Sequence, residues 1–499
     1  MKPSATLILA GLLCATFALR AARLDQPIVE NYVGRQVPTA MVARNLDRGS
    51  GFLRPQLDTG PFPNLFLVEP PLFATFAVGL RRLAGQALGP SGRLVSALAT
   101  VLAGWGLFGL ARRREGGCAA LWAVAAFAVF PLTLRYGRAF QPDALMLGLV
   151  VAGLACWDVY ESDMSRSRGW PWLIAGWLLL AAGLAVKIVA AAVLVPLIAG
   201  ILRPPRRGKA VLALLTLVPA LLWYVHAARL LGEGTGSRAS ADNGSIWLGA
   251  LGPLALGRAE TWRHVGRFLV VRGFTPIGFG LAVVGLAWPS GGNRLWRLWG
   301  GSALAGLALL AGKLHHEYYW LVLAPVAAVG VGRVLAGLME RSRGAALAAA
   351  AGGGLLTLAL VQSASTWRTP SEWSALPEAA RCVRAVVPPE AWLVAPEALL
   401  FAADRRGCRL EPPGPGARRA AGEWGGTLAD RGPLALIEFY RLRGARFVAD
   451  VGGGAGDPAR LGLREAIRGR YNVLVDRDGV LIAILNERVP RASARDGLR

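Results

Sequence analysis

Residues 169–202 read GWPWLIAGWLLLAAGLAVKIVAAAVLVPLIAGIL, and Lys187 is the only ionisable side chain among them. A helix needs about 20 mainly apolar residues to cross the hydrocarbon core of a bilayer, so this stretch is long enough for two short spans. We expect these spans over 169–186 and 188–202, with Lys187 at the connection between them. An ionisable residue at membrane depth is costly, which makes Lys187 a functional candidate.

The composition of the whole chain points the same way. Of its 499 residues 54% are hydrophobic and only 17% are charged, and the mean hydropathy is +0.43. Soluble globular proteins carry roughly a quarter charged residues. Apolar blocks of spanning length recur along the chain, so the composition predicts an α-helical polytopic membrane protein.

The net charge of +24 does not indicate a nucleic-acid-binding protein, because the basic residues are not gathered in one segment. They form short clusters between apolar blocks, at 112–114, 203–209 and 333–343. Cytoplasmic loops of membrane proteins carry such an excess of Lys and Arg. We therefore expect a bacterial inner-membrane protein with a cytoplasmic N-terminus and a periplasmic or extracellular C-terminal domain, and no nucleic-acid partner.

About eleven spans are expected, and they place residues 1–365 in a membrane domain. Its first periplasmic loop covers residues 20–90, with a helix-compatible run at 37–46 and an interfacial or re-entrant segment at 64–80. Residues 370–499 mix helical and strand patterns, which predicts a small soluble α/β domain. The expected spans are 4–19, 91–111, 117–134, 142–159, 169–186, 188–202, 209–231, 272–288, 296–312, 317–338 and 344–362.

The C-terminal domain also contains Cys382 and Cys408. An oxidising compartment would allow these two thiols to form a disulfide, and otherwise they remain free. The chain has no CxxC motif and no Cys/His ligand spacing, so the sequence requires no metal or other cofactor. The pattern predicts helices over 375–387, 433–443 and 463–468, strands over 391–395 and 446–451, and a hairpin over 471–485.

Ionisable residues gather on the expected outer side of the membrane. Besides Lys187, they include the strings RYGRAFQPD at 135–143 and HHEYY at 315–319. Transfer from a lipid phosphate to a hydroxyl needs such a set: a carboxylate takes the acceptor proton and cations stabilise the departing phosphate. Alternatively the carboxylates are solvated loop charges, and Arg135 and Arg138 reach lipid headgroups. The first loop contributes Asp25, Glu30, Arg35, Arg44, Asp47, Asp58 and Glu69.

Four stretches resemble the GT-C type of polytopic glycosyltransferases, close to the protein O-mannosyltransferases and aminoarabinose transferases. They are RQVPTAMVARNL at 35–46, EPPL at 69–72, YGRAFQPDALM at 136–146 and AVK at 185–187, with HEYY at 316–319 as a weaker match. The resemblance covers roughly residues 5–340 and implies a polyprenyl-phosphate-linked sugar donor and transfer with inversion. It also implies an acidic base in the first loop and basic residues that hold the phosphate; a divalent metal helps some members.

The sequence departs from this family pattern at two places. Many relatives carry an Asp-Glu pair where this chain has Arg35-Gln36, and a Lys where it has Glu69. By the resemblance, Glu30 is then the expected base, with Asp58 second, and Arg138 and Lys187 are the expected phosphate contacts. The full set of expected substrate-binding residues is Arg35, Arg44, Glu69, Arg138, Asp143, Lys187, His315, His316 and Tyr318.

The leading hypothesis is thus an inverting glycosyltransferase with its site at the periplasmic face. Its acceptor is a hydroxyl of a protein, a lipid or a glycan. One rival is a polyprenyl-lipid or small-molecule transporter or flippase, although the chain has no evident internal repeat of the kind common in transporters. Another is a catalytically degenerate assembly protein, which the two departures from the pattern would fit.

Overall fold

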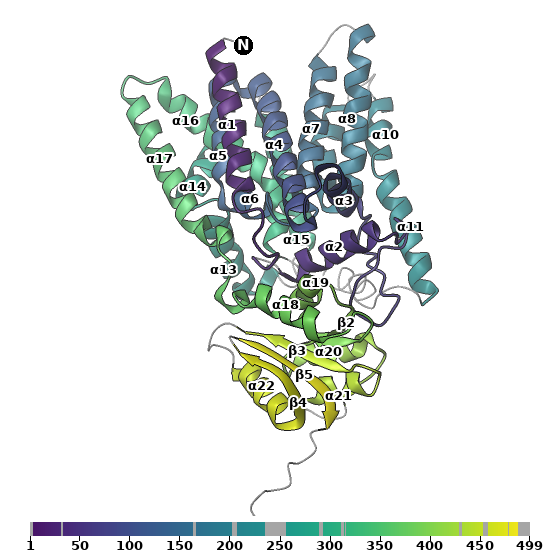
Figure 1. Cartoon of the computed structure of the whole chain (residues 1–499). Coiled ribbons are helices and arrows are strands. Elements are labelled where there is room, and N and C mark those ends of the chain that lie inside the picture. Colours follow the sequence, from purple (N-terminus) through teal and green to yellow (C-terminus); the bar gives the residue numbers. More distant parts are fainter. Residues whose placement is uncertain are drawn as a thin grey trace, which may run out of the picture.

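A bundle of helices carries a small α/β region at one end, opposite the chain's N-terminus (Figure 1). This architecture is that of the computed structural model of the chain. The structure describes residues 3–30, 33–162, 166–201, 207–234, 256–288, 293–310, 314, 316–428, 432–452, 458–477 and 479–487.

The bundle consists of long apolar helices and shorter pieces that interrupt them. The helices before residue 202 are α1 (Pro3–Ala21), α2 (Val33–Asp47), α3 (Leu72–Ala84), α4 (Leu88–Glu115), α5 (Gly117–Val129), α6 (Pro131–Tyr136), α7 (Asp143–Ser162), α8 (Arg166–Val186), η1 (Ile188–Val193) and α9 (Leu194–Ile201). Those that follow are α10 (Arg207–Leu215), α11 (Val218–Gly232), α13 (Ala259–Arg267), η3 (Phe268–Gly273), α14 (Pro276–Ala287), α15 (Asn293–Leu309), η5 (Glu317–Leu323), α16 (Ala324–Met339), α17 (Gly344–Ser363), η6 (Ala364–Trp367) and η7 (Ser371–Trp373).

Each expected span corresponds to a helix or a run of helices in the described residues. Seven helices there are long and apolar enough to cross a membrane. An eighth candidate is the pair Ala259–Gly273 and Pro276–Ala287, which bends by 101° at its break. The expected spans 117–134 and 188–202 are represented by the shorter apolar helices Gly117–Val129 and Ile188–Ala199. The expected span 296–312 corresponds to α15.

Glycines let the helices of the bundle approach closely. A methyl group at Gly285 of α14 would overlap the carbonyl oxygen of Gly330 in α16. One at Gly148 of α7 would overlap the carbonyl oxygen of Ala99 in α4. Small residues have this role in membrane helix packing, where van der Waals contact replaces the hydrophobic effect as the driving force.

The α/β region is built on a five-stranded sheet with the order β2-β1-β3-β5-β4. The strands β2, β1 and β3 are parallel, and β5 and β4 continue the sheet in antiparallel fashion. The predicted helices, strands and hairpin of this region are confirmed, whereas α19, β2 and α20 were not predicted. The elements are α18 (Leu376–Val386), β1 (Leu393–Ala395), α19 (Glu397–Ala403), β2 (Gly407–Arg409), α20 (Pro415–Glu423), α21 (Ala435–Arg441), β3 (Phe447–Val451), α22 (Pro458–Arg470), β4 (Tyr471–Arg477) and β5 (Val480–Glu487).

The structure contradicts the predicted disulfide, because Cys382 and Cys408 are both free thiols. Cys408 pairs in register with Val394, and both belong to the apolar cluster on the face of the sheet that α20, α21 and α22 cover. Cys382 belongs instead to the cluster on the other face, with α18 and α19. The sheet therefore separates the two sulfur atoms.

The first loop joins the α/β region through main-chain hydrogen bonds. Thr59 forms a parallel bridge with Gly407 at the free edge of β2. The amide of Gly60 donates to the carbonyl of Gly407 at 2.8 Å, and the amide of Gly407 donates to the carbonyl of Asp58 at 3.0 Å. In addition, α19 packs on α2, so loop, sheet and bundle meet at one place (Figure 1).

Candidate active site

Lys187 and Asp143 form a buried ion pair at the end of the bundle that faces the first loop. The backbone at Lys187 is extended between α8 and η1, and Asp143 is the first residue of α7. The Lys187 ammonium lies 2.6 Å from Asp143 Oδ1, and both side chains are buried. A buried ion pair is costly to desolvate and needs further partners to be stable.

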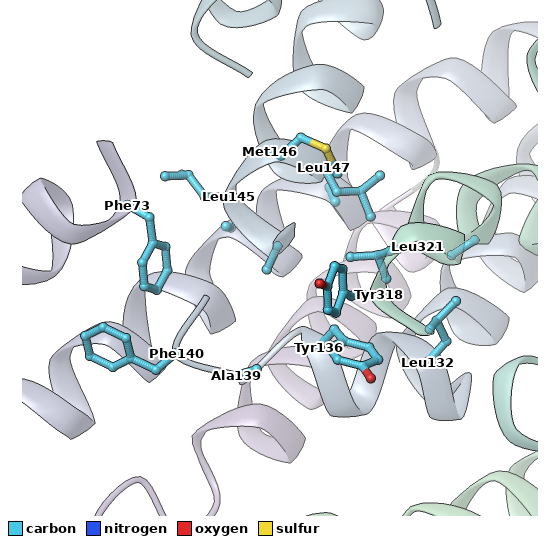
Figure 2. Close-up of a cluster of buried hydrophobic side chains, with 14 of the residues drawn as sticks. Phe73, Leu132, Tyr136, Ala139, Phe140, Leu145, Met146, Leu147, Tyr318 and Leu321 are labelled. Atoms are coloured by element: carbon cyan, nitrogen blue, oxygen red, sulfur yellow. The ribbon is translucent and has the colours of Figure 1, made fainter. Parts of the chain in front are cut away.

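Aromatic rings supply those partners for Lys187. Its ammonium lies 4.1 Å from the ring centre of Tyr318 and 4.8 Å from that of Tyr319, in position for cation–π attraction. The imidazole of His316 stacks on Tyr318 at 5.4 Å. On the other side, Tyr136 meets Tyr318 edge to face, with ring centres 6.0 Å apart (Figure 2).

A second charged group adjoins these rings and is centred on Glu317. Its carboxylate lies 2.7 Å from Arg272 and 3.5 Å from Arg135, and it accepts a hydrogen bond of 3.3 Å from the hydroxyl of Tyr136. The group thus holds two cations beside the tyrosines that surround Lys187.

Arg35 and Glu69 form another ion pair, contributed by the first loop. Arg35 lies in α2 with its guanidinium 5.3 Å from the ring centre of Phe66, and Glu69 precedes α3. Arg35 is also within electrostatic range of Lys187, which brings the two ion pairs together. Glu69 and Pro142, which immediately precedes Asp143, line a small hollow of about 20 Å³.

Glu30, the expected base, lies in a buried ion pair with Arg93. Both carboxylate oxygens of Glu30 are bonded to one nitrogen of Arg93, at 2.6 and 2.7 Å, and both side chains are buried. Arg93 also donates to main-chain carbonyls of residues 24, 26 and 27. Glu30 is therefore a structural ion-pair partner that holds the start of the first loop against α4.

Asp58 has a similar structural position at the junction with the α/β region. Its carboxylate accepts hydrogen bonds from Arg44 at 2.5 Å and from Asn45 at 3.2 Å, and it lies 3.8 Å from Arg406. Arg44 also donates to the carbonyl of Phe401 at 2.7 Å. Neither Asp58 nor Arg44 belongs to the group around Lys187, and both tie the first loop to α19 and β2.

Arg138, an expected phosphate contact, connects main-chain segments of the bundle. Its guanidinium is buried and donates to the carbonyls of Ala22, Arg23 and Thr366, at 2.8, 2.9 and 2.5 Å. These bonds join the end of α1 to η6.

The structure thus brings together Arg35, Glu69, Asp143, Lys187, His316 and Tyr318 of the predicted set. His315 lies outside the described residues. Roles for Tyr136, Tyr319 and Arg272 were not predicted. The signal for Arg272 was its position as a cation at the end of a span. Among the described residues, no group of three or more His, Cys, Asp and Glu side chains could hold a metal ion.

Residues 68–230 match the family model described as dolichyl-phosphate-mannose-protein mannosyltransferase. The structure resembles that of ArnT from Cupriavidus metallidurans bound to undecaprenyl phosphate, with a TM-score of 0.65 and 15% identity, over 96% of this chain and 97% of that one. No curated protein sequence matches the chain.

Two structures of the Archaeoglobus fulgidus oligosaccharyltransferase are also similar. The complex with Zn and sulfate gives a TM-score of 0.60 at 14% identity, over 93% of this chain and 71% of that one. AglB in complex with an inhibitory peptide and a dolichol-phosphate gives 0.59 at 13% identity, over 98% and 75%. The chain has the GT-C fold of these glycosyltransferases.

Proposed function

We infer from the GT-C fold and the buried charges at its first loop that the chain is an inverting glycosyltransferase. Its donor is a sugar linked to a polyprenyl phosphate, and the transfer takes place at the periplasmic face of a bacterial inner membrane. The observation that carries this proposal is the Lys187–Asp143 ion pair beside Arg35 and Glu69. It lies in a fold that binds undecaprenyl phosphate in ArnT.

Lys187 is the proposed contact for the lipid phosphate. It is a buried cation at the end of a span, where a lipid phosphate at the membrane surface can reach it. Asp143 holds the ammonium in place at 2.6 Å, and Tyr318 flanks it. As the bond between the sugar and the phosphate breaks, negative charge develops on the phosphate oxygen, and a fixed cation stabilises it.

Glu69 is the proposed base. A base must touch the acceptor hydroxyl, and Glu69 lines a hollow, whereas Asp143 is fully buried. The hydroxyl proton passes to the Glu69 carboxylate while the hydroxyl oxygen bonds to the anomeric carbon. The bond from that carbon to the phosphate oxygen breaks on the opposite side, its electron pair leaves with the lipid phosphate, and the configuration inverts.

Binding of the lipid phosphate can be tested before the sugar or the acceptor is known. Undecaprenyl phosphate should raise the melting temperature of the purified chain, because a ligand that binds only the folded state stabilises it. Undecaprenol, which lacks the phosphate, should not. The Lys187→Met variant should lose the stabilisation, and an equal response in that variant would contradict the phosphate assignment.

A matched control for this experiment is Lys209→Met. Lys209 is also paired with a carboxylate, Glu161, at 2.7 Å, and its ammonium lies 4.5 Å from the ring centre of Tyr160. It belongs to one of the basic clusters expected in the cytoplasm. This variant should respond to undecaprenyl phosphate like the parent protein.

One feature favours a transporter as the second candidate. The helices Ala259–Gly273 and Pro276–Ala287 meet at 101°, and broken helices are common at transporter binding sites. A transporter would move a labelled polyprenyl-phosphate sugar across the membrane of a vesicle without breaking its phosphate–sugar bond. Chemical analysis of the label after incubation separates the two activities.

A further inference from the structure

A cavity of about 270 Å³ lies in the α/β region at the carboxyl ends of the parallel strands. Pro396 and Glu397 follow β1, and Glu411 follows β2. Asp450 is the second-last residue of β3. Trp373 of η7 also lines it. The cavity is separate from the Lys187 group described above.

The topology of the sheet makes this position a common one for ligands. From β1 the chain passes through α19 to the edge strand β2, and it then returns across β1 to β3. The helix α19 covers one face, whereas α20, α21 and α22 cover the other. In open α/β sheets, ligands bind outside the carboxyl ends of the strands at the point where the strand order reverses.

The charges around the cavity are already balanced against each other. Arg409 is bonded to Glu423 at 2.9 Å and lies 3.2 Å from Glu411. The buried Asp450 accepts hydrogen bonds from Arg460, the shortest at 2.7 Å. An anionic ligand would meet carboxylates beside each cation, so the lining does not favour a phosphate or a nucleotide.

A neutral ligand rich in hydroxyl groups fits this lining better. A hydroxyl can donate to a carboxylate such as Glu411 and accept from a guanidinium such as Arg460, and neither contact leaves a buried charge unpaired. The half-buried ring of Trp373 offers an apolar surface for the carbon face of a sugar ring. Together these groups match the alternating polar and apolar surface of a saccharide.

Part of the cavity wall is formed by the first loop. Val33 and Gly34 at the start of α2 line it, and the next residue is Arg35, which pairs with Glu69 in the candidate active site. A molecule held in the cavity therefore lies against the same helix turn that contributes to the reaction site. An acceptor must be held beside the reaction site, and this cavity adjoins it through α2.

We propose that this cavity is an acceptor subsite that binds a neutral saccharide unit, so that the acceptor of the enzyme is a glycan or a glycan-bearing molecule. The assignment rests on the proposed glycosyltransferase function, because a subsite for the acceptor presupposes the transfer. Binding of a saccharide, however, can be measured without any transfer taking place.

Saturation-transfer difference NMR on the full chain provides the test. The chain should be in lipid nanodiscs, because detergents with sugar headgroups would compete for the cavity. The probes are methyl mannoside, N-acetylglucosamine and cellobiose, with inorganic phosphate as an anionic competitor. At least one saccharide should give a signal, and that signal should weaken at least tenfold in Trp373→Ala and in Glu411→Gln.

A matched control is Trp105→Ala, which removes an exposed tryptophan of α4 that does not line the cavity. Its saccharide signal should equal that of the parent protein. The proposal is overturned if no saccharide gives a signal, if both cavity variants keep the full signal, or if inorganic phosphate displaces the saccharide.

A kinetic measurement separates this inference from the proposed function. In a working transfer assay, Trp373→Ala should raise the KM for the acceptor about tenfold and leave kcat close to that of the parent. Transfer with an unchanged KM would contradict the acceptor subsite but would leave the proposed glycosyltransferase function unaffected. Saccharide binding without any transfer from a polyprenyl-phosphate sugar would instead contradict the proposed function.

Discussion

Glu69 and Glu30 are both first-loop carboxylates paired with an arginine, but their surroundings differ. The pair formed by Glu69 and Arg35 borders a hollow, whereas the pair formed by Glu30 and Arg93 is enclosed among main-chain carbonyls. For this reason Glu69, and not Glu30, is the proposed contact for the acceptor. The same substitution at the two positions should therefore have different consequences.

Replacing Glu69 with Gln should lower the rate of sugar transfer by at least about 100-fold, which is the usual contribution of a general base. The melting temperature should fall by less than in the Glu30 variant, because the side chains of the Glu69–Arg35 pair are 11% and 9% exposed and those of the Glu30–Arg93 pair are almost fully buried. Replacing Glu30 with Gln should instead destabilise the protein by about 3–5 kcal/mol, since Arg93 would lose its buried partner. Thermal unfolding together with a transfer assay measures both effects. A near-normal rate of transfer by Glu69→Gln would contradict the assignment of Glu69 as the base.

Glu397, at the start of α19, lines the proposed saccharide cavity and makes the stability of the protein depend on pH. Burial raises the pKa of this carboxyl to about 7, opposed by Arg409 and reinforced by Glu423 and Glu411. The folded protein thus keeps the proton up to about pH 7, whereas an unfolded chain loses it near 4.5. The stabilisation is fully present below pH 4.5 and is lost progressively as the pH rises from 4.5 through 7, by about 3 kcal/mol.

The variant Glu397→Gln should remove this pH dependence. At pH 5 the parent carries a neutral carboxyl, so the amide should change the melting temperature little. At pH 8 the parent bears the cost of a buried charge and the variant does not, so the variant should melt at a higher temperature. A difference in melting temperature that is the same at both pH values would contradict the raised pKa.

Individual site residues could be predicted from the sequence only where their position alone is unusual. Lys187 was predicted because a lone cation in an apolar stretch is costly. That its partner is Asp143 could not be predicted, because the contact depends on how α7 and α8 pack. The ion pair of Glu30 with Arg93 could not be predicted for the same reason, because Arg93 is far away along the chain.

At the scale of elements, the close approach of α14 and α16 depends on glycine. A methyl group at Gly285 would overlap the main chain at Gly330, whereas one at Gly280 of the same helix would meet nothing within 4 Å. Gly285→Ala should therefore lower stability by about 1–3 kcal/mol, as overpacking does. Gly280→Ala is the matched control and should be neutral or slightly stabilising. Equal melting temperatures of the two variants would contradict this packing.

The apolar helices themselves could be predicted, because hydropathy reports which segments can lie in lipid. Their breaks could not. The expected span 117–134 ends early, at Val129, since Pro131 begins the separate helix α6. In the same way Glu317–Leu323 forms a 3₁₀ turn before α16, and this turn delivers the tyrosines of the site. Hydropathy does not show where a backbone changes direction within an apolar stretch.

At the scale of the whole molecule, the first loop connects the bundle to the α/β region. Asp58 contacts Arg44 from within the loop and Arg406 from the α/β region, and Thr59 pairs with the edge of the sheet. The sequence predicted both parts separately, but it gave no sign of this junction, which joins residues far apart in the chain. Through it the proposed saccharide cavity and the candidate active site share helix α2.

The measurement that tests the central proposal most directly follows the fate of a labelled donor. Membranes that contain the chain are incubated with radiolabelled polyprenyl-phosphate sugars, and the lipid, acceptor and aqueous fractions are then separated. We predict that the label leaves the lipid and becomes bound to an acceptor, and that it stays on the lipid with Lys187→Met. Label that remains on the lipid with the parent protein, whether or not it crosses the membrane, would contradict a glycosyltransferase.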